Sequence, residues 1–481
     1  MNLVITETQL SSDNDNGTGT ASTGLMLSVG HLPAAAYRDS LPPKVKVEAA
    51  RPANPATITP SRASEANIST KIFENVIAPL RVDDFFSYHW GTNYCLVKGF
   101  EDKFADLLPW PELNSILRHH RIPFPRLRLC KKGNPIPASA YSVEKEMGSE
   151  TLQRRRRALD TPPVHIRNLY EQLQQGATMT LDAVDELYNP VSDLCESFEK
   201  LFNERVQANA WVSCAEVPAV SPHWDDHDVF ILQVSGEKRW RIHGVSRPYP
   251  LYRDVDANTE CPKGIVWDGI LQPGDLLYLP RGTWHSATAM GEPTLHLSIG
   301  VYSETGIDLM GWLQDHLRNN AAFRMNLPRF SSGAARQQHM NDLRRELLAL
   351  WDDDILAKFF EDHQTRTESR RPTLSLPWVL GDSRIPDDPA TQLLWTAPRH
   401  VKLEMATRDK ENVAVMVTEA RRYCFSAKAY PILQHFISTE RTSLGELFAS
   451  QNSDLEPGLI CSFVRQLALE GLVAIKTTSG N

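Results

Sequence analysis

The fold of this chain is decided by residues 221–234, which read SPHWDDHDVFILQV. The apolar run 229–234 carries β-branched and aromatic residues and is interrupted only by Gln233, a composition that predicts a buried strand. The polar segment before this run places His223 and Asp225 two residues apart. Because positions i and i+2 of a strand point to the same face, an imidazole nitrogen and a carboxylate oxygen converge there. This pair matches two of the three ligands of a 2-His-1-carboxylate site for non-haem Fe(II).

The third ligand is expected from His285. Residues 273–275, Pro-Gly-Asp, predict a turn, and Leu276–Leu279 predicts a short strand. A second turn at 280–282 leads to the strand that begins with His285. This histidine lies far along the chain from His223, so only a closed sheet could bring the two side chains together.

A lysine on the next expected strand predicts a site for an anion. Residues 235–236, Ser-Gly, turn the chain, and Lys238, Trp240 and Ile242 then share one face. A lysine on an apolar face is costly to bury unless an anion meets it. The distal carboxylate of 2-oxoglutarate is such an anion. Asn209, on the preceding strand, could add a hydrogen bond.

These segments resemble the JmjC-type 2-oxoglutarate oxygenases, and within them the cupin-4 ribosomal oxygenases. The residues that carry the resemblance are Asn209, Pro222, His223, Trp224, Asp225, Asp226, Leu232, Gln233, Gly236, Lys238, Arg239, Trp240, Gly274, Asp275 and His285. The resemblance covers roughly residues 200–300 and implies a double-stranded β-helix core. It also implies Fe(II) at His223, Asp225 and His285, and 2-oxoglutarate at Lys238 with Asn209 lining the pocket.

The resemblance implies hydroxylation of a protein or peptide side chain, with release of succinate and CO2. By likeness to the ribosomal oxygenases, the target would be a histidine or arginine, for example of a ribosomal protein. Two alternatives remain open at this point. One is N-methyl-lysine demethylation by the same core, and the other is a non-catalytic cupin with a winged helix that acts as a binding protein. The three ligands together with Lys238 argue against the second alternative.

Composition excludes several other classes of protein. The chain has 481 residues, 41% of them hydrophobic, which indicates two or three domains with real cores. A net charge of −8 disfavours broad binding to nucleic acid and suits a basic protein partner. None of the seven cysteines forms a C-x-x-C pair, which favours reduced thiols in the cytoplasm. We expect no membrane span, since no apolar run is long enough, and no secretory signal, since no basic region precedes an apolar core at the N-terminus.

The expected fold class is α+β, with four segments. Residues 1–71, rich in Ser, Thr, Asn, Ala and Pro, predict a disordered tail. Residues 72–305 would form the catalytic domain, and the apolar stripes of 306–372 predict helices that, by family resemblance, form a homodimer. The order of elements in 373–481 resembles a winged helix. Core strands are expected at 208–214, 228–234, 238–243, 276–279, 285–289 and 294–302.

Basic residues outside the core do not predict nucleic-acid binding. The helix expected at 457–470 has Arg465 as its only basic residue, so packing or protein contact is favoured over DNA reading. The run Arg154–Arg157 is flanked by acidic residues and predicts a solvated helix face. Another helix is expected over 104–117.

Other polar residues near the core receive structural predictions. Asp226 is expected to cap a turn, while His227 and Asp228 are expected at the surface or rim. His243 and His296 have no carboxylate at i+2 and are expected to be structural. The tryptophans of this region are expected to pack in the core, with one or two lining a substrate slot: Trp211, Trp224, Trp240 and Trp284.

Overall fold

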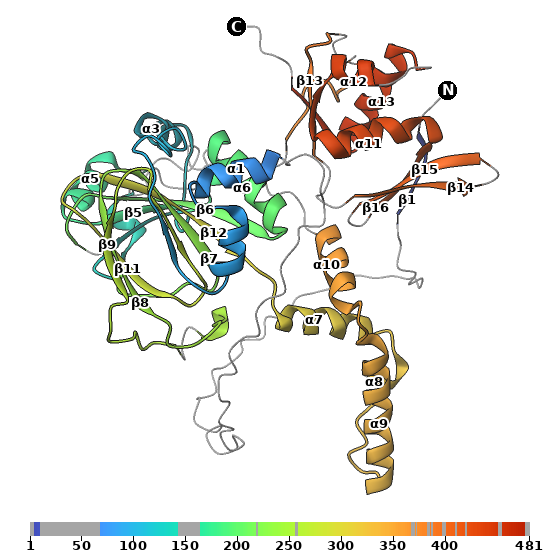
Figure 1. The fold of residues 1–481 in the computed structure, drawn as a ribbon, viewed down its shortest axis with the longest axis horizontal. Coiled ribbons are helices and arrows are strands. Elements are labelled where there is room, and N and C mark those ends of the chain that lie inside the picture. The colour runs from blue at the N-terminus through green and yellow to red at the C-terminus, as the bar shows by residue number, and fades with distance from the viewer. Residues whose placement is uncertain are drawn as a thin grey trace, which may run out of the picture.

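The computed structural model contains both helices and antiparallel sheets (Figure 1). It describes residues 4–9, 68–142, 164–217, 220–254, 258–366, 371, 373–381, 385, 388–396, 401–408, 411–418, 421–450 and 455–476. Within these ranges, no helix has the length and apolar composition needed to cross a membrane. The arginine run 154–157 and its expected helix lie outside the described residues.

Two sheets form the centre of the N-terminal unit. The larger sheet has the strand order β2-β10-β7-β12-β6-β5-β3-β4, and the smaller has the order β11-β8-β9. Their bounds are β2 Cys95–Val97, β3 Leu127–Lys131, β4 Asn134–Ile136, β5 Thr178–Leu181, β6 Arg205–Ser213, β7 Asp228–Ser235, β8 Lys238–Gly244, β9 Trp267–Leu271, β10 Leu276–Leu279, β11 Trp284–Ala289 and β12 Thr294–Tyr302. Successive strands alternate between the sheets, β7 to β8 and β10 to β11, which is the double-stranded β-helix arrangement. The α+β prediction is confirmed.

One apolar cluster fills the space between the two sheets. It joins residues of both sheets: Val229, Ile231, Trp240, Ile242, Leu271, Leu277 and Leu279. The opposite face of β7 is also covered, because Phe230 and Leu232 belong to a second cluster beneath the helices. Burial on both faces explains why β7 reads as an almost continuous apolar run.

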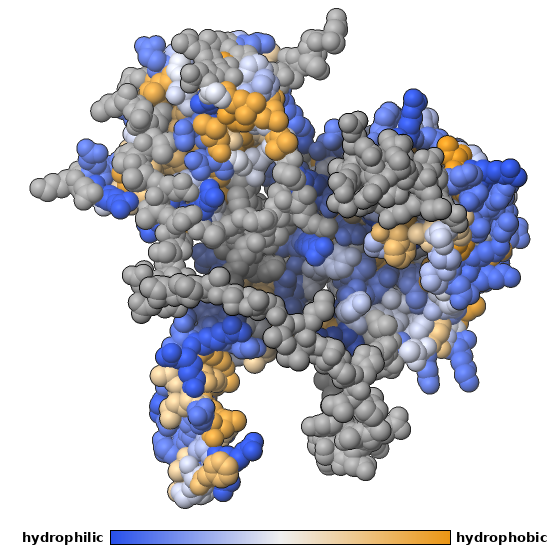
Figure 2. Space-filling model, turned by 180° about the vertical axis from the view of Figure 1, so that it is seen from behind, coloured by the Kyte–Doolittle hydropathy of each residue, from blue (hydrophilic) through white to orange (hydrophobic). Residues whose placement is uncertain are grey.

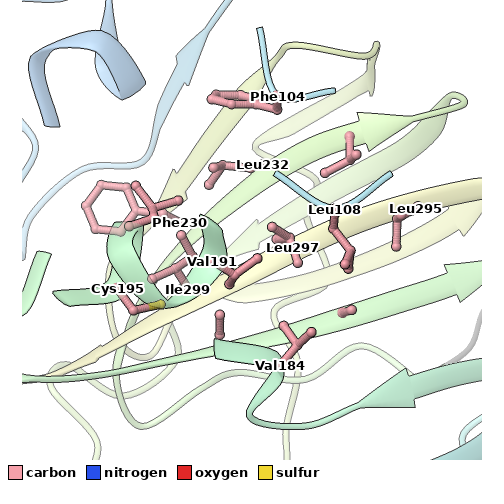
Figure 3. Packing of buried hydrophobic residues seen from close by; sticks show 14 of the residues in the cluster. Phe104, Leu108, Val184, Val191, Cys195, Phe230, Leu232, Leu295, Leu297 and Ile299 are labelled. Carbon is pink, nitrogen blue, oxygen red and sulfur yellow. The ribbon is translucent and has the colours of Figure 1, made fainter. Parts of the chain in front are cut away.

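Helices cover the outer face of the larger sheet (Figure 1). They are α1 Ile68–Ile77, α2 Val82–Tyr88, α3 Trp110–His119, α5 Ile166–Gln174 and α6 Asn189–Phe202. Figure 3 shows Val191 and Cys195 of α6 beside Phe230 of β7 and Ile299 of β12. The helix predicted over 104–117 is wrong in its start. It begins only at Trp110, after Pro109 and with Pro111 in its first turn, where a missing N–H is tolerated.

A helical arm follows β12 and extends away from the sheets (Figure 1). It consists of α7 Gly306–Leu317, α8 Ala321–Arg324, α9 Gly333–Leu350 and α10 Ile355–Arg366. A small core joins α7 to α10 through Leu309, Leu313, Ile355 and Phe359. By contrast, the arm leaves large apolar side chains exposed, and they appear as orange groups along the arm in Figure 2. They include Ile307, Met310, Met325, Leu327, Phe330, Met340, Leu348, Trp351, Leu356 and Phe360.

Buried charges attach the C-terminal part of the chain to α6. Arg371 lies 2.7 Å from Asp185 and 2.5 Å from Glu199, and all three side chains are almost fully buried. Lys200 of α6 lies 2.7 Å from Glu440 of the C-terminal unit. Removing one partner of a buried ion pair strongly destabilises the folded protein, because the other charge stays buried without compensation. These contacts therefore fix the segment after α10 to the N-terminal unit.

The C-terminal unit has its own core and two small sheets. The sheets have the orders β17-β13-β18 and β1-β16-β15-β14. The bounds are β13 Gln392–Trp395, β14 Lys402–Arg408, β15 Glu411–Thr418, β16 Arg421–Ser426, α11 Tyr430–Thr439, β17 Arg441–Ser443, α12 Leu444–Ser450, α13 Pro457–Leu469 and β18 Val473–Lys476. The order from α11 to β18 is compatible with the winged-helix prediction. Arg465, the only basic residue of α13, donates to the carbonyls of Trp378 and Gly381.

The tail predicted to be disordered over residues 1–71 contains a strand and a helix start at its two ends, while residues 1–3 and 10–67 lie outside the described residues. Strand β1, Val4–Gln9, pairs antiparallel with β16, and α1 begins at Ile68. The first stretch reads VITETQ, whose β-branched residues suit the open edge of a sheet. Pairing with an edge strand far along the chain compensates for the ordering entropy, and local composition does not reveal it.

Candidate metal centre

Backbone pairing brings the three predicted ligands together. The N–H of His223 donates to the carbonyl of His285 at 3.1 Å, and the N–H of His285 donates back to the carbonyl of His223 at 2.8 Å. Nearby, the N–H of Gly282 donates to the carbonyl of Asp225 at 2.9 Å. The polar segment before β7 is therefore joined to β11 by an isolated antiparallel bridge between His223 and His285, and the closed sheet supplies the long-range contact that the sequence required.

The three side chains converge at this point. One ligand atom from each of His223, Asp225 and His285 lies within 4.8 Å of the other two, and the described residues contain no other such group of three. Nε2 of His285 is 3.6 Å from a carboxylate oxygen of Asp225. Two imidazoles and one carboxylate at this spacing form the donor set of a 2-His-1-carboxylate metal site.

Hydrogen bonds orient both imidazoles for metal binding. Nδ1 of His223 is 3.1 Å from the carbonyl of Ser221, and Nδ1 of His285 is 2.9 Å from the carbonyl of Thr283. A carbonyl oxygen can only accept, so each Nδ1 must carry the proton. Each Nε2 then keeps its lone pair for a metal ion. The residues present thus fit a divalent cation.

Electrostatics favour the same protonation states. Burial lowers the pKa of His285 to about 4, and His223 acts in the same direction. Burial alone would raise the pKa of Asp225, but the neighbouring histidines, His285 first, outweigh it and hold this pKa below its usual value. A neutral imidazole at His285 and an ionised carboxylate at Asp225 are the forms that bind metal without releasing protons.

Lys238 lies inside the structure, at the start of β8. Its side chain is 2% exposed, with Nζ 3.2 Å from the hydroxyl of Ser213 and 3.4 Å from Nδ1 of His296. Among the described residues, no carboxylate forms an ion pair with it. Burial lowers the pKa of Lys238 to about 7. A buried ammonium with only neutral neighbours is a binding site for an anion.

Aromatic rings connect this lysine to the metal centre. The ring of His296 stacks on Trp211 with centroids 6.0 Å apart and meets Trp240 edge-on at 5.4 Å. The ring of Trp240 also lies 5.9 Å, centroid to centroid, from the ring of His285. Sequence reasoning treated His296 as structural and missed its contact with Lys238. The missing information was the pairing of β12 with β6, since His296 is opposite Trp211 in that register.

Asn209 lies on the same face of β6 as Trp211 and Ser213. Its side-chain oxygen accepts from the N–H of Ala183 and from Gln207, both at 3.0 Å. The residue is therefore held near the pocket, but it forms no hydrogen bond with Lys238. Its assignment to the co-substrate pocket stays a prediction.

Of the two polar residues just after the ligands, Asp228 is more buried than expected, whereas His227 is half-buried. Asp228, expected at the surface, is almost fully buried and accepts a hydrogen bond from the hydroxyl of Tyr278 at 2.5 Å. His227 stacks on Tyr302 with ring centroids 4.4 Å apart. A Cβ at Gly300 would lie 2.6 Å from the His227 ring, so this glycine makes room for it. The surface prediction for Asp228 is wrong because the helices cover that end of β7.

A family profile described as the JmjC domain matches residues 185–309. This segment is therefore similar to a JmjC domain. The bifunctional lysine-specific demethylase and histidyl-hydroxylase NO66 of Drosophila willistoni is 26% identical over 269 residues, which cover 54% of this chain and 33% of that protein. Ribosomal oxygenase 2 of Mus musculus is 28% identical over 271 residues, which cover 54% of this chain and 55% of that protein. The chain thus spans about a third to a half of these relatives.

A solved structure shares the fold over a larger part of the chain. The ribosomal oxygenase YcfD of Escherichia coli aligns with a TM-score of 0.51 at 18% identity, covering 82% of this chain and 98% of that one. The match extends beyond the residues 185–309 that match the JmjC profile. It supports the double-stranded β-helix as the fold that positions the candidate metal centre.

Proposed function

We propose that this chain is an Fe(II)- and 2-oxoglutarate-dependent oxygenase whose iron ligands are His223, Asp225 and His285. The observation that carries the proposal is their convergence within 4.8 Å, with both imidazole Nε2 atoms left free by hydrogen bonds at Nδ1. Bound Fe(II) would supply the electron-transfer chemistry of oxygen activation, with 2-oxoglutarate as the second reductant. The YcfD structure determined in complex with cobalt and 2-oxoglutarate, with a TM-score of 0.51, supports this assignment.

The residues of this chain would hold 2-oxoglutarate between Lys238 at one end and the metal ion at the other. In β8, Lys238 lies opposite Ala289, and Ile242 lies opposite His285. Lysine and histidine are therefore four residues apart along the sheet, roughly 13 Å at about 3.3 Å per residue. Their side chains and a five-carbon dicarboxylate together span this separation. Trp240, midway, closes the pocket against water.

Lys238 would receive the distal carboxylate, assisted by the hydroxyl of Ser213. Its pKa of about 7 without an anion leaves the ammonium only partly protonated at neutral pH. An arriving carboxylate raises this pKa and keeps the proton on Nζ. Asn209 would line the same pocket. Because no carboxylate of the described residues competes for the lysine, the site selects a ligand that brings its own negative charge.

The proposed reaction is hydroxylation of a histidine or arginine side chain in a protein or peptide, possible substrates being ribosomal proteins. The names of the relatives, histidyl-hydroxylase and ribosomal oxygenase, support this substrate class. The NO66 name also includes lysine demethylation, which is the second candidate. Both reactions would release succinate and CO2, so the metal centre alone does not separate them.

Mass spectrometry separates these outcomes. The purified protein is incubated with Fe(II), ascorbate, 2-oxoglutarate and total ribosomal proteins, and succinate is measured in parallel. Gain of one oxygen on histidine or arginine supports hydroxylation, and the Asp225→Ala variant should produce neither this product nor succinate. Loss of a lysine methyl group without any oxygen gain would favour the demethylase. No succinate from the wild type would favour a non-catalytic binding protein.

For the remaining segments we propose a homodimer formed through 306–372, next to a catalytic domain at 72–305. The apolar side chains exposed along α7 to α10 support an interface there, because large exposed apolar patches are uncommon on monomers. We also propose that 373–481 is a winged-helix-like domain that contacts protein rather than nucleic acid. The use of Arg465 within the fold supports this. The seven free cysteines are compatible with the cytoplasm.

A further inference from the structure

Two tryptophans beside the candidate ligands both donate to one surface segment. Trp224 stands between His223 and Asp225 in the sequence, and its indole N–H donates to the backbone carbonyl of Asn258 at 2.9 Å. Trp284 immediately precedes His285, and its indole N–H donates to the hydroxyl of Ser246 at 2.7 Å. Both segments that carry the candidate ligands are therefore linked to the segment between β8 and β9.

A third hydrogen bond joins these two anchors. The hydroxyl of Ser246 donates to the side-chain oxygen of Asn258 at 2.6 Å. The hydroxyl thus accepts from Trp284 and donates to Asn258, so both of its roles are used. Asn258 and Trp284 are almost fully buried. The result is one continuous chain of hydrogen bonds from Trp284 through Ser246 and Asn258 to Trp224.

The anchored segment lies against the turn that carries the third ligand. A Cβ at Gly282 would lie 2.4 Å from Pro250, so the two residues are in direct contact. The N–H of Gly282 also donates to the carbonyl of Asp225 at 2.9 Å. Residues 246–254, which we name the lip, are thereby placed next to the metal centre.

The lip presents aromatic side chains to solvent. Tyr249 is 63% exposed and Tyr252 is 76% exposed. An ion pair of 3.0 Å between Arg247 and Asp254 connects the two ends of the lip. Tyrosines held on an ordered segment contribute large contact area at low entropic cost, which makes them common in protein-binding surfaces. Because these tyrosines lie next to the metal centre, they suit a polypeptide substrate that must place one side chain at the metal.

We propose that Ser246 and Asn258 are positioning residues that set the lip at a fixed distance from the metal ligands. A polypeptide substrate docks on Tyr249 and Tyr252, and the hydrogen-bond chain aligns it with the metal centre. This inference rests on the proposed oxygenase function and identifies where its protein substrate binds. The tryptophans beside the ligands act as attachments for the lip.

The test is the variant Ser246→Ala, which removes the central hydroxyl and leaves the indole of Trp284 without its acceptor. Ser286→Ala is the matched control. Ser286 follows His285 on the same strand, but its hydroxyl lies 3.4 Å from Nε2 of His243 and is not part of the hydrogen-bond chain that holds the lip. Ser246→Thr restores a hydroxyl and should rescue the wild-type behaviour.

Hydrogen exchange of the lip is measured first, because it needs no activity. We expect exchange in residues 246–254 to accelerate about tenfold in Ser246→Ala, the scale for losing one hydrogen bond and leaving a buried donor without a partner. Ser286→Ala and Ser246→Thr should exchange like the wild type. Unchanged exchange in Ser246→Ala would show that the chain of hydrogen bonds does not hold the lip.

Coupling of the two half-reactions is measured second, with total ribosomal proteins as the probe. In Ser246→Ala, succinate formation without protein should stay within about twofold of the wild type, while hydroxylated product per succinate should fall about tenfold. An unchanged ratio of hydroxylated product to succinate would overturn the positioning role, whether succinate formation and hydroxylation both stay the same or both fall equally. Absence of succinate from the wild type would instead refute the proposed oxygenase, and hydrogen exchange would still decide whether the lip is anchored.

Discussion

Replacement of Lys238 by methionine should stabilise the protein without co-substrate and abolish its stabilisation by 2-oxoglutarate. Methionine fills a similar volume, and the substitution removes a buried charge that no carboxylate in the described part of the chain balances. Burial lowers the pKa of Lys238 from 10.5 to about 7, a difference that corresponds to roughly 5 kcal/mol. Ser213 and His296 lose a hydrogen-bond partner, which costs about 1 kcal/mol each. We therefore expect a net gain of about 2–4 kcal/mol in the free energy of unfolding.

The pH dependence follows from the sign of this shift. The folded state loses the proton of Lys238 near pH 7, whereas the unfolded state keeps it up to about pH 10.5. Between these values the unfolded state binds more protons, so the stability contributed by this group rises with pH. The advantage of Lys238→Met over the wild type should be greatest below pH 7 and should shrink as the pH approaches 10.

Calorimetric unfolding at pH 7 with Co2+ present measures both the gain in stability of Lys238→Met and its loss of stabilisation by 2-oxoglutarate. A 2-oxoglutarate concentration of about 100 times its dissociation constant should stabilise the wild type by about 2.7 kcal/mol and leave the variant unchanged. Lys263→Met, at an exposed lysine, is the control and should stay within about 0.5 kcal/mol of the wild type. Equal stabilisation of wild type and Lys238→Met by 2-oxoglutarate would refute the anion site. A less stable Lys238→Met would refute the desolvation argument.

Three further predictions concern the metal, the buried ion pairs and the arm. Asp225→Ala should lose bound Co2+ in elemental analysis while circular dichroism stays unchanged, and a variant that retains stoichiometric metal would contradict the ligand assignment. Arg371→Ala leaves two buried carboxylates without their cation and should lower the free energy of unfolding by about 3–5 kcal/mol; a loss below about 1 kcal/mol would show that the carboxylates find other partners. Leu348→Asp should convert the proposed dimer to a monomer in light scattering, and a wild type that already scatters as a single chain at micromolar concentration would count against the dimer.

Local sequence pattern determined several elements without any tertiary information. The strands expected at 276–279 and 294–302 have those bounds in the structure, because short apolar or alternating runs between turn residues suit only a buried strand. The placement of His223 and Asp225 two residues apart and the buried face of Lys238 also follow from the period of a strand. These features depend only on residues that are close to one another in the sequence.

Other elements exist only because a distant partner is present. Strand β9 reads WDGIL, with an aspartate and a glycine that disfavour a strand, and it forms because β8 pairs with it throughout its length. Strand β1 likewise depends on the open edge of β16. Local propensity is weak in such stretches, so cross-strand hydrogen bonds decide the outcome.

The candidate site shows the same division. Residue types and spacing predicted which side chains could bind a metal and an anion, but backbone pairing with His285 closes the triad. The contact of His296 with Lys238 depends on sheet register, and the link from Trp284 to Ser246 depends on where the loop after β8 packs. Sequence specifies the chemistry that each strand presents. Closure of the two sheets decides which of these groups meet, because a long-range contact forms only when the whole fold offsets the entropy of bringing its ends together.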